Sequence, residues 1–284
     1  MPVGEQCTDR VNVLGVGIDA ITMGDALRTI DSWITRREPH YVCLCNVYGV
    51  MEAQRDPVLR MVYNASGLTT PDGMPLVWLC KKLRFPSTER VYGPDLMLAL
   101  CEHSIERGYR HFFYGGEPGV PEKLVRRLKL RFPDLAVAGT YSPPFRELSD
   151  EEDRAVVSMI NAARPDILWV GLGAPKQERW MAQHVGLVHA PVLIGVGAAF
   201  DFIAGVKKQA PPILRKMCLE WAFRLCTEPR RLWRRYLVNN PLFVFYLTLQ
   251  LLRIVRYPEP EPVPYEQLRV MLLSEKKPEE GEGQ

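Results

Sequence analysis

The sequence predicts an α/β protein with an open, largely parallel sheet and helices on both faces, Rossmann-like, followed by a helical C-terminal appendage. Short apolar runs alternate with amphipathic stretches from Val11 to about Ala204. Several runs end in glycine-rich corners, which is typical of strands that lead into helices at the carboxyl edge of a parallel sheet. Beyond residue 208 the sequence turns helical, aromatic and basic.

We therefore expect three regions: an α/β catalytic domain over residues 1–208, a basic, aromatic helical appendage over 209–257, and a disordered tail over 258–284. The tail is predicted from its Pro- and Glu-rich composition. Seven cysteines without a C-x-x-C pair favour reduced thiols in a cytoplasmic protein. The first ten residues are polar and predict no signal peptide.

Seven apolar runs are candidate strands. In chain order they are VNVLGV (11–16), YVCLCN (41–46), GLTTP (67–71), HFFYGG (111–116), LAVAGTY (135–141), DILWVGLG (166–173) and PVLIGVGAAF (191–200). Helices are predicted between them. Thr22 is placed to cap one helix, and Ser149 with Glu152 forms the capping box of another. The acidic run that follows Ser149 suits a helix start rather than a metal site.

Polar residues and glycines mark the corners after these runs. Asp72, between Pro71 and Gly73, can act as a general base at the sheet edge or form an ordinary turn. Gly115 and Gly116 would let the backbone approach a phosphate before the next helix. That segment lacks the P-loop and dinucleotide fingerprints, so the usual motifs do not support nucleotide binding there.

Two later corners repeat the arrangement. In GLGAPKQERW (171–180), Gly173 precedes Lys176 and Gln177, which suit phosphate, ribose or a uracil-like base, and in GVGAAFDFIAG (195–205) Asp201 suits a hydroxyl. Each could equally cap a helix or fill a turn. Because parallel strands bring their carboxyl ends to one edge, we expect the corners to meet there. The five histidines have no metal-ligand spacing and no D-x-D pair follows a strand, so we expect metal-free chemistry and no cofactor.

The appendage combines arginines with apolar residues. Arg224, Arg231 and Arg234 would share one helical stripe if the helix continues through Pro229, and would stabilise a departing diphosphate or form a solvated, lipid-facing stripe. The apolar portion, 241–255, is shorter than the ~20 residues needed to cross a bilayer. We expect it to lie on a membrane surface, with packing on the body or another subunit as the alternative. A net charge of +3 does not indicate nucleic-acid binding.

Taken together, TPDG, RVYGPDLM, GLGAPKQERW, GVGAAFDFIAG and LEWAFRLCTEPRRLWRRY resemble the WecG/TagA/CpsF glycosyltransferases (glycosyltransferase family 26), in the right order from about Val11 to Tyr236. The resemblance implies an inverting, metal-independent transfer of a sugar from a UDP-sugar to a prenyl-diphosphate-linked saccharide in cell-surface polysaccharide synthesis. It also implies a cytoplasmic protein, peripheral on the inner face of the plasma membrane, and a possible homo-oligomer.

The resemblance also implies residue roles, with Asp72 as the general base. Gln177 and its neighbours would hold the UDP-sugar, and the three appendage arginines would close over the diphosphate. The implied substrate-binding residues are Asn46, Arg90, Gly93, Asp95, Gly173, Lys176, Gln177, Glu178, Arg224, Arg231 and Arg234. Relatives can carry a threonine where this chain has Leu44, which puts the sugar or acceptor specificity in doubt rather than the reaction.

Two alternatives remain open from the residues. A non-catalytic scaffold that binds a nucleotide or prenyl phosphate would keep the glycines and basic helices but would not need Asp72. A nucleotide-dependent oxidoreductase is disfavoured because the dinucleotide fingerprint is missing. The donor sugar is not named by the sequence, and glucose, N-acetylmannosamine and its uronic acid all suit a UDP site.

Overall fold

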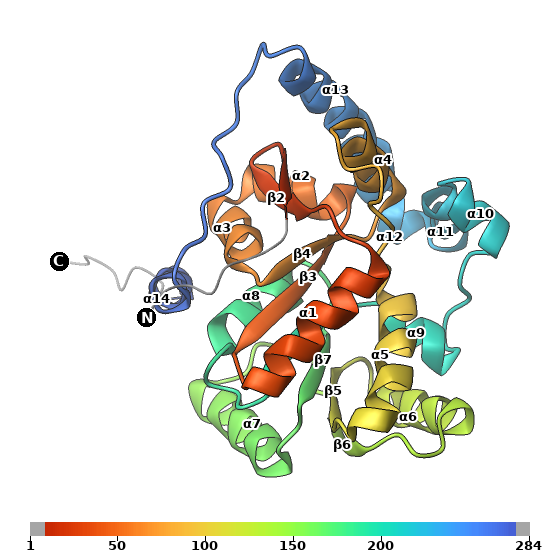
Figure 1. The fold of residues 1–284 in the computed structure, drawn as a ribbon, viewed down its shortest axis with the longest axis vertical. Helices are drawn as coiled ribbons and strands as arrows, with labels where there is room; N and C mark the ends of the chain where they lie inside the picture. Colours follow the sequence, from red (N-terminus) through yellow and green to blue (C-terminus); the bar gives the residue numbers. More distant parts are fainter. Residues whose placement is uncertain (1–8, 277–284) are drawn as a thin grey trace.

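A six-stranded parallel sheet forms the centre of the protein in the computed structural model, which describes residues 9–276 (Figure 1). Its strand order is β4-β3-β8-β7-β5-β6. The strands are β3 (His40–Cys45), β4 (Leu68–Pro71), β5 (His111–Gly115), β6 (Val137–Tyr141), β7 (Ile167–Gly171) and β8 (Val192–Gly195). The predicted parallel α/β fold is confirmed.

Helices cover both faces of the sheet. One layer is α1 (Met23–Arg36), α5 (Gly93–Arg107), α6 (Val120–Arg131) and α9 (Ala199–Ala204), and the other is α2 (Val47–Arg55), α3 (Pro57–Ala65), α7 (Asp150–Ala163) and α8 (Lys176–His184). Residues alternate between the layers along each strand: Val42 and Leu44 join the first core, while Cys43 and Cys45 join the second. The predicted capping boxes at Thr22 and Ser149 are both formed.

The first predicted strand is wrong in extent and pairing. VNVLGV is divided between β1 (Arg10–Val13) and β2 (Val16–Asp19), which pair antiparallel as a separate two-stranded sheet. Leu14 and Gly15 have φ of 54° and 84°, so the chain reverses in two residues with positive φ, as a type I′ turn requires.

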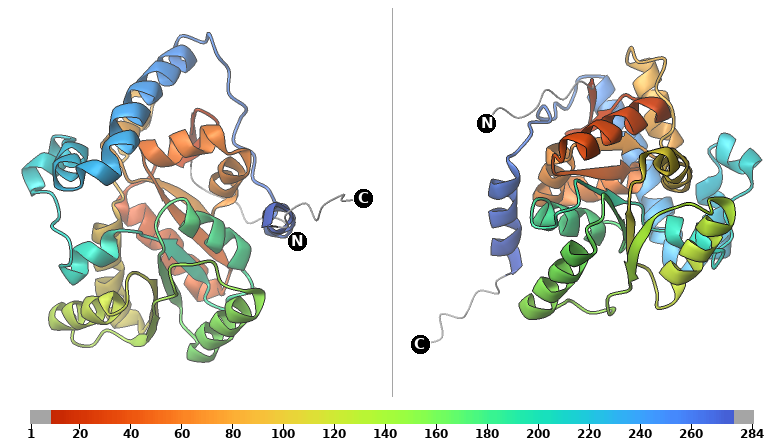
Figure 2. Two further views of the ribbon diagram at one scale, coloured as in Figure 1. Left: turned by 180° about the vertical axis from the view of Figure 1, so that it is seen from behind. Right: turned by 60° about the horizontal axis from the view of Figure 1, so that its bottom comes forward.

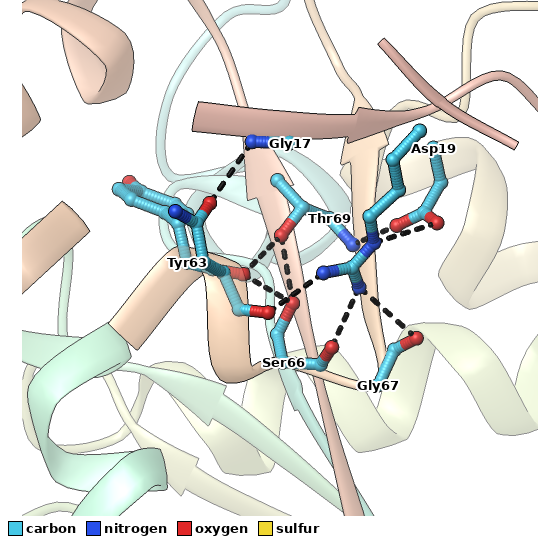
Figure 3. A network of polar contacts seen from close by, with 8 residues as sticks. Gly17, Asp19, Tyr63, Ser66, Gly67 and Thr69 are labelled. Carbon is cyan, nitrogen blue, oxygen red and sulfur yellow. Dashed lines mark hydrogen bonds and ion pairs between the residues drawn. The ribbon is translucent and has the colours of Figure 1, made fainter. Parts of the chain in front are cut away.

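Arg10 fastens this hairpin to the end of α3 and the turn before β4, in the network that Figure 3 shows around Asp19, Ser66 and Gly67. Its guanidinium forms an ion pair with Asp19 at 3.1 Å and donates to the carbonyls of Asn64 and Ser66, each at 2.7 Å. The Asn64 side chain accepts from the Gly17 amide at 2.9 Å. Since Asp19 is fully buried, the Arg10 charge is what makes its burial tolerable.

The appendage projects from the body opposite α14 (Figure 2). Its elements are α10 (Pro212–Lys216), α11 (Glu220–Thr227), α12 (Pro229–Trp233), a π-helical turn (Arg234–Val238) and α13 (Asn239–Leu251). α4 (Met74–Lys82) and α13 line the same cavity. Over residues 9–276, every helix is too short or too polar to traverse a bilayer.

The predicted disordered tail is wrong over Tyr265–Lys276, which form α14 against α8 and α3. Leu268 and Leu272, one turn apart, are buried in the body, and Arg269 donates to the Gln183 carbonyl at 2.9 Å. These leucines come soon after a Pro- and Glu-rich run, and the average composition of the whole segment therefore predicted disorder. Residues 258–264 form neither helix nor strand, and the remainder of the predicted tail, 277–284, lies outside the described residues.

Candidate active site

A cavity of about 970 Å³ opens at the carboxyl edge of the sheet. The ends of β3, β4, β7 and β8 line it from the body, together with α4 and α9, and α11 to α13 line it from the appendage. The strand-end corners predicted to meet do meet here. Ligands of open α/β folds bind at this edge, so the cavity is the candidate active site.

Asp72 lies at the end of β4 with its carboxylate in this cavity. Its amide donates to the Cys45 carbonyl at 2.8 Å, which fixes the corner. The Asn46 side-chain amide lies 3.4 Å from Oδ2, and the Arg90 guanidinium lies 3.9 Å from Oδ1. Oδ1 has no hydrogen-bond partner in the described part of the chain. Oδ1 itself is buried, but the Asp72 side chain as a whole is 18% exposed, so the carboxylate group is what the site offers to a substrate hydroxyl.

The surroundings of Asp72 set its pKa near neutrality. Burial raises the pKa of this carboxyl to about 6, although the Arg90 guanidinium acts to lower it. The Glu220 carboxylate raises the pKa further, and the Asn46 hydrogen bond lowers it. A carboxylate with such a pKa is ionised at neutral pH and accepts a proton more readily than an ordinary aspartate.

Asn46 connects a helix start to this carboxylate. Its Oδ1 accepts from the Gly49 amide at 3.3 Å and so caps α2, while its Nδ2 faces Asp72. Each end of one side-chain amide thus has a separate partner.

Arg90 joins the body to the appendage. It donates to Glu220 Oε2 at 2.8 Å and to the Asp72 carbonyl, and its guanidinium lies 4.1 Å from the Tyr92 ring centroid. Glu220 begins α11, so the first turn of the appendage is tied to the corner that holds Asp72.

The glycines divide into contact and packing positions. Gly93, Gly116 and Gly173 line the cavity, and a Cβ on Gly173 would meet open space. Gly115 is not a lining residue: its φ is 121°, and a Cβ there would lie 2.6 Å from the Gly171 carbonyl oxygen. Gly115 therefore permits close approach of β5 and β7 rather than ligand contact.

Gln177 and Glu178 are both buried at the start of α8. Gln177 lines the cavity, accepts from the Gly173 amide at 3.2 Å and donates to Glu178 Oε1 at 3.0 Å. Glu178 does not line the cavity, and burial raises its pKa to about 7. Glu178 therefore holds the Gln177 side chain by this hydrogen bond without itself reaching the cavity.

The structure separates the other predicted polar residues. Lys176 and Asp201 line the cavity, and Asp201 pairs with Lys207 at 2.6 Å. Asp95 is exposed and lies outside the cavity, with the nearest Arg215 nitrogen at 3.7 Å. Leu44 lines the cavity beside Gly93, so no hydroxyl is offered at that point.

The predicted stripe of three arginines is only partly formed. Arg224 and Arg231 line the cavity, but Arg234 is exposed with its guanidinium over Trp233, and Arg235 lines the cavity instead. α11 ends before Pro229, and the π-helical turn rotates the following residues relative to an α-helix. This break in helical phase leaves Arg235, rather than Arg234, at the cavity.

Arg235 is held in an unusual environment. Its guanidinium lies 4.0 Å from the Tyr48 ring centroid, and its Nε has no hydrogen-bond partner within residues 9–276. Burial lowers its pKa. A buried cation with an unused donor beside a cavity suits an anionic ligand.

Sequence analysis missed Glu220, Tyr92 and Arg235 as site residues. An acidic residue inside a strongly basic segment was the available signal for Glu220. The doubled arginine in RRLWRRY was the signal for Arg235, but choosing between the two required the helical phase. No sequence signal distinguishes Tyr92 from a core tyrosine.

A carboxylate of near-neutral pKa at a parallel-sheet edge, opposed by arginines, defines a group-transfer site that can deprotonate a hydroxyl and stabilise an anionic leaving group. A model of the glycosyl transferase WecG/TagA/CpsF family matches residues 11–257. The chain belongs to this family and is a glycosyltransferase.

Two bacterial relatives illustrate the similarity. An N-acetylglucosaminyldiphosphoundecaprenol N-acetyl-beta-D-mannosaminyltransferase of Bacillus spizizenii is 31% identical over 206 residues, covering 72% of this chain and 78% of that protein. A Staphylococcus aureus protein of the same description is 28% identical over 240 residues, covering 84% of this chain and 92% of the relative.

Proposed function

We propose that this protein transfers a hexosyl or N-acetylhexosaminyl group from a UDP-sugar to a saccharide carried on a prenyl diphosphate, with inversion and without a metal ion. The observation that carries the proposal is Asp72, a carboxyl with a pKa of about 6 at a cavity that Arg224, Arg231 and Arg235 also line. The relatives' names, which specify an N-acetylglucosaminyldiphosphoundecaprenol acceptor, support this class of acceptor.

In the proposed step, the Asp72 carboxylate takes the proton of the acceptor hydroxyl. The hydroxyl oxygen attacks the anomeric carbon from the side opposite UDP, and the bond from that carbon to the diphosphate oxygen breaks. The leaving UDP carries the negative charge away, and arginines that line the cavity stabilise it. Lys176 and Gln177, at the start of α8, are placed to hold the nucleotide part.

We also propose that the protein works on the inner face of the plasma membrane. Leu237, Val238, Phe245, Leu252 and Ile254 expose apolar surface on the appendage, in a segment rich in arginine. Apolar side chains with neighbouring cations favour binding to an anionic lipid surface. A lipid-linked acceptor would be met at that surface.

The proposal is tested by UDP release from a panel of UDP-sugars, with a prenyl-diphosphate-linked N-acetylglucosamine acceptor and EDTA present. We expect release that depends on the acceptor and persists in EDTA, and a fall of about 10²-fold or more in Asp72→Asn, which cannot take the proton. Asp95→Asn is the matched control because Asp95 lies outside the cavity.

Equal activity of wild type and Asp72→Asn would contradict the assignment of the base. Loss of activity in EDTA that returns with a divalent metal would contradict the metal-independent step. UDP binding without turnover of any donor would favour the scaffold interpretation.

A further inference from the structure

We propose that the space between α4 and α13 is a groove for the first isoprene units of the acceptor's own lipid. This inference rests on the proposed function and adds the part of the acceptor that Asp72 and the arginines do not explain. The groove is one arm of the cavity that contains Asp72.

Two apolar walls form the groove. From α4 it is lined by Met74, Pro75, Trp78 and Leu79, with Lys82 at the end of that helix, and from α13 by Asn240, Phe243, Val244, Leu247 and Leu251. The α13 residues recur at a spacing of three or four and therefore share one helical face. In Figure 1 the two helices overlap beyond the sheet edge, and residues of both line the cavity.

Both walls begin at the polar centre of the site. α4 starts two residues after Asp72, and α13 follows directly on the π-helical turn that carries Arg235. From Asn240 to Leu251 the α13 wall extends about 16 Å. Each apolar wall therefore starts close in the chain to a polar residue of the site, as a lipid attached to a saccharide at Asp72 would require.

Three of the lining side chains are unusually exposed for apolar residues, while Leu79 and Phe243 are buried. Trp78 is 52% exposed, Val244 61% and Leu251 44%. Apolar lining at such exposure marks a binding surface for an apolar partner. The acceptor lipid is the occupant favoured by continuity, because its other end must reach Asp72 through the same cavity.

The test compares two acceptors in solution, without membrane or detergent, using the full chain. Both carry N-acetylglucosamine on a diphosphate, but one ends in a farnesyl group and the other in a methyl group. Wild type should prefer the farnesyl acceptor by at least about tenfold in kcat/KM, because an apolar pocket discriminates by about that factor or more. Because no membrane is present, a preference for the farnesyl acceptor cannot result from recruitment of the protein to a membrane.

Leu251→Asp and Trp78→Ala, one on each wall, should reduce this preference about tenfold. Leu252→Asp is the matched control: Leu252 is the next residue, is 64% exposed and does not line the cavity, so its variant should retain the preference. Because all three side chains are substantially exposed, these variants should fold.

A wild-type preference near one, or a preference unchanged in both wall variants, would overturn the proposal and leave the groove to a membrane lipid or a second copy. Farnesyl diphosphate binding, measured by calorimetry, separates the groove from the function. Binding that Leu251→Asp abolishes, without transfer to any acceptor, would support the groove and reject the proposed function. Neither binding nor transfer would reject both.

Discussion

Asp72 is shaped by opposing neighbours at the residue scale. Burial and Glu220 raise the pKa of its carboxyl, while Arg90 and Asn46 lower it, with a result of about 6. Arg90 forms ion pairs with both Asp72 and Glu220, so its single positive charge is shared between two carboxylates. The same ion pairs that attach the appendage thus tune the proposed base.

This balance predicts a pH dependence. A base works when deprotonated, so kcat/KM should fall about tenfold per pH unit below about 6 and level off above it. Asn46→Asp keeps an oxygen to cap α2 but replaces the Nδ2 donor with a like charge, which should raise the pKa of Asp72. The acid limb should then move to higher pH in a pH–rate profile.

The control is the protein's melting temperature across the same pH range, which should show that Asn46→Asp remains folded. An acid limb with the same midpoint in both proteins would contradict the role given to the Asn46 amide.

Local sequence patterns predicted the cavity residues that follow strands directly. Asp72, Gly173 and Gln177 lie where a strand end and a corner must place them, and Asn46, which only the family resemblance predicted, lies beside them. The sequence could not show that Asp95 lies outside the cavity, because tertiary contacts decide whether a side chain enters a cavity. Its Arg215 neighbour comes from α10, more than a hundred residues along the chain.

At the scale of elements, small changes in backbone winding decide which side chains face the site. A two-residue reversal turned one predicted strand into the β1–β2 hairpin. The π-helical turn exchanged Arg234 for Arg235. Hydrophobic and basic periodicity assume an uninterrupted element, so neither change could be predicted from spacing.

The π-helical turn predicts that substitutions of Arg234 and Arg235 differ in their effect on kcat. Arg235→Ala should lower kcat about 10²-fold, because a buried guanidinium at the cavity would no longer stabilise the leaving group. Arg234→Ala removes an exposed charge and should leave kcat close to wild type. Steady-state UDP release under saturating substrates measures both.

Arg235→Lys distinguishes charge from shape, since lysine keeps the charge but not the planar fork over Tyr48. A larger loss in Arg234→Ala than in Arg235→Ala would contradict the placement of the two side chains.

At the scale of the whole molecule, α14 packs on the body and so brings the chain back to it after the appendage. On the way, the Asn12 side chain donates to the Pro258 carbonyl at 2.9 Å, and beyond it Arg179 pairs with Glu275 at 2.6 Å. Arg179 belongs to α8, the helix that also carries Gln177. Both ends of the appendage are therefore attached to the body.

This packing predicts that α14 contributes to stability. Leu268→Ala should lower the free energy of unfolding by about 2–4 kcal/mol, because the side chain is fully buried. Leu273→Ala, on the same helix but 51% exposed, should change it by less than about 0.5 kcal/mol. Urea unfolding followed by circular dichroism provides the measurement, and equal effects of the two substitutions would contradict the docking of α14.

Alternating helices and strands predicted the layered body, because its periodicity is repeated in every unit. The docking of α14 could not be predicted in the same way. Two leucines one turn apart fit an isolated helix as well as a docked one, and their partners, α3 and α8, lie far away in the sequence.

The family match ends at residue 257, before α14 begins. A fragment cut at that boundary for expression would lose Leu268 and Leu272 and leave the apolar surfaces of α3 and α8 uncovered. Such surfaces promote self-association, so poor solubility of the shortened fragment would reflect a missing piece of the core rather than a defect in the catalytic fold.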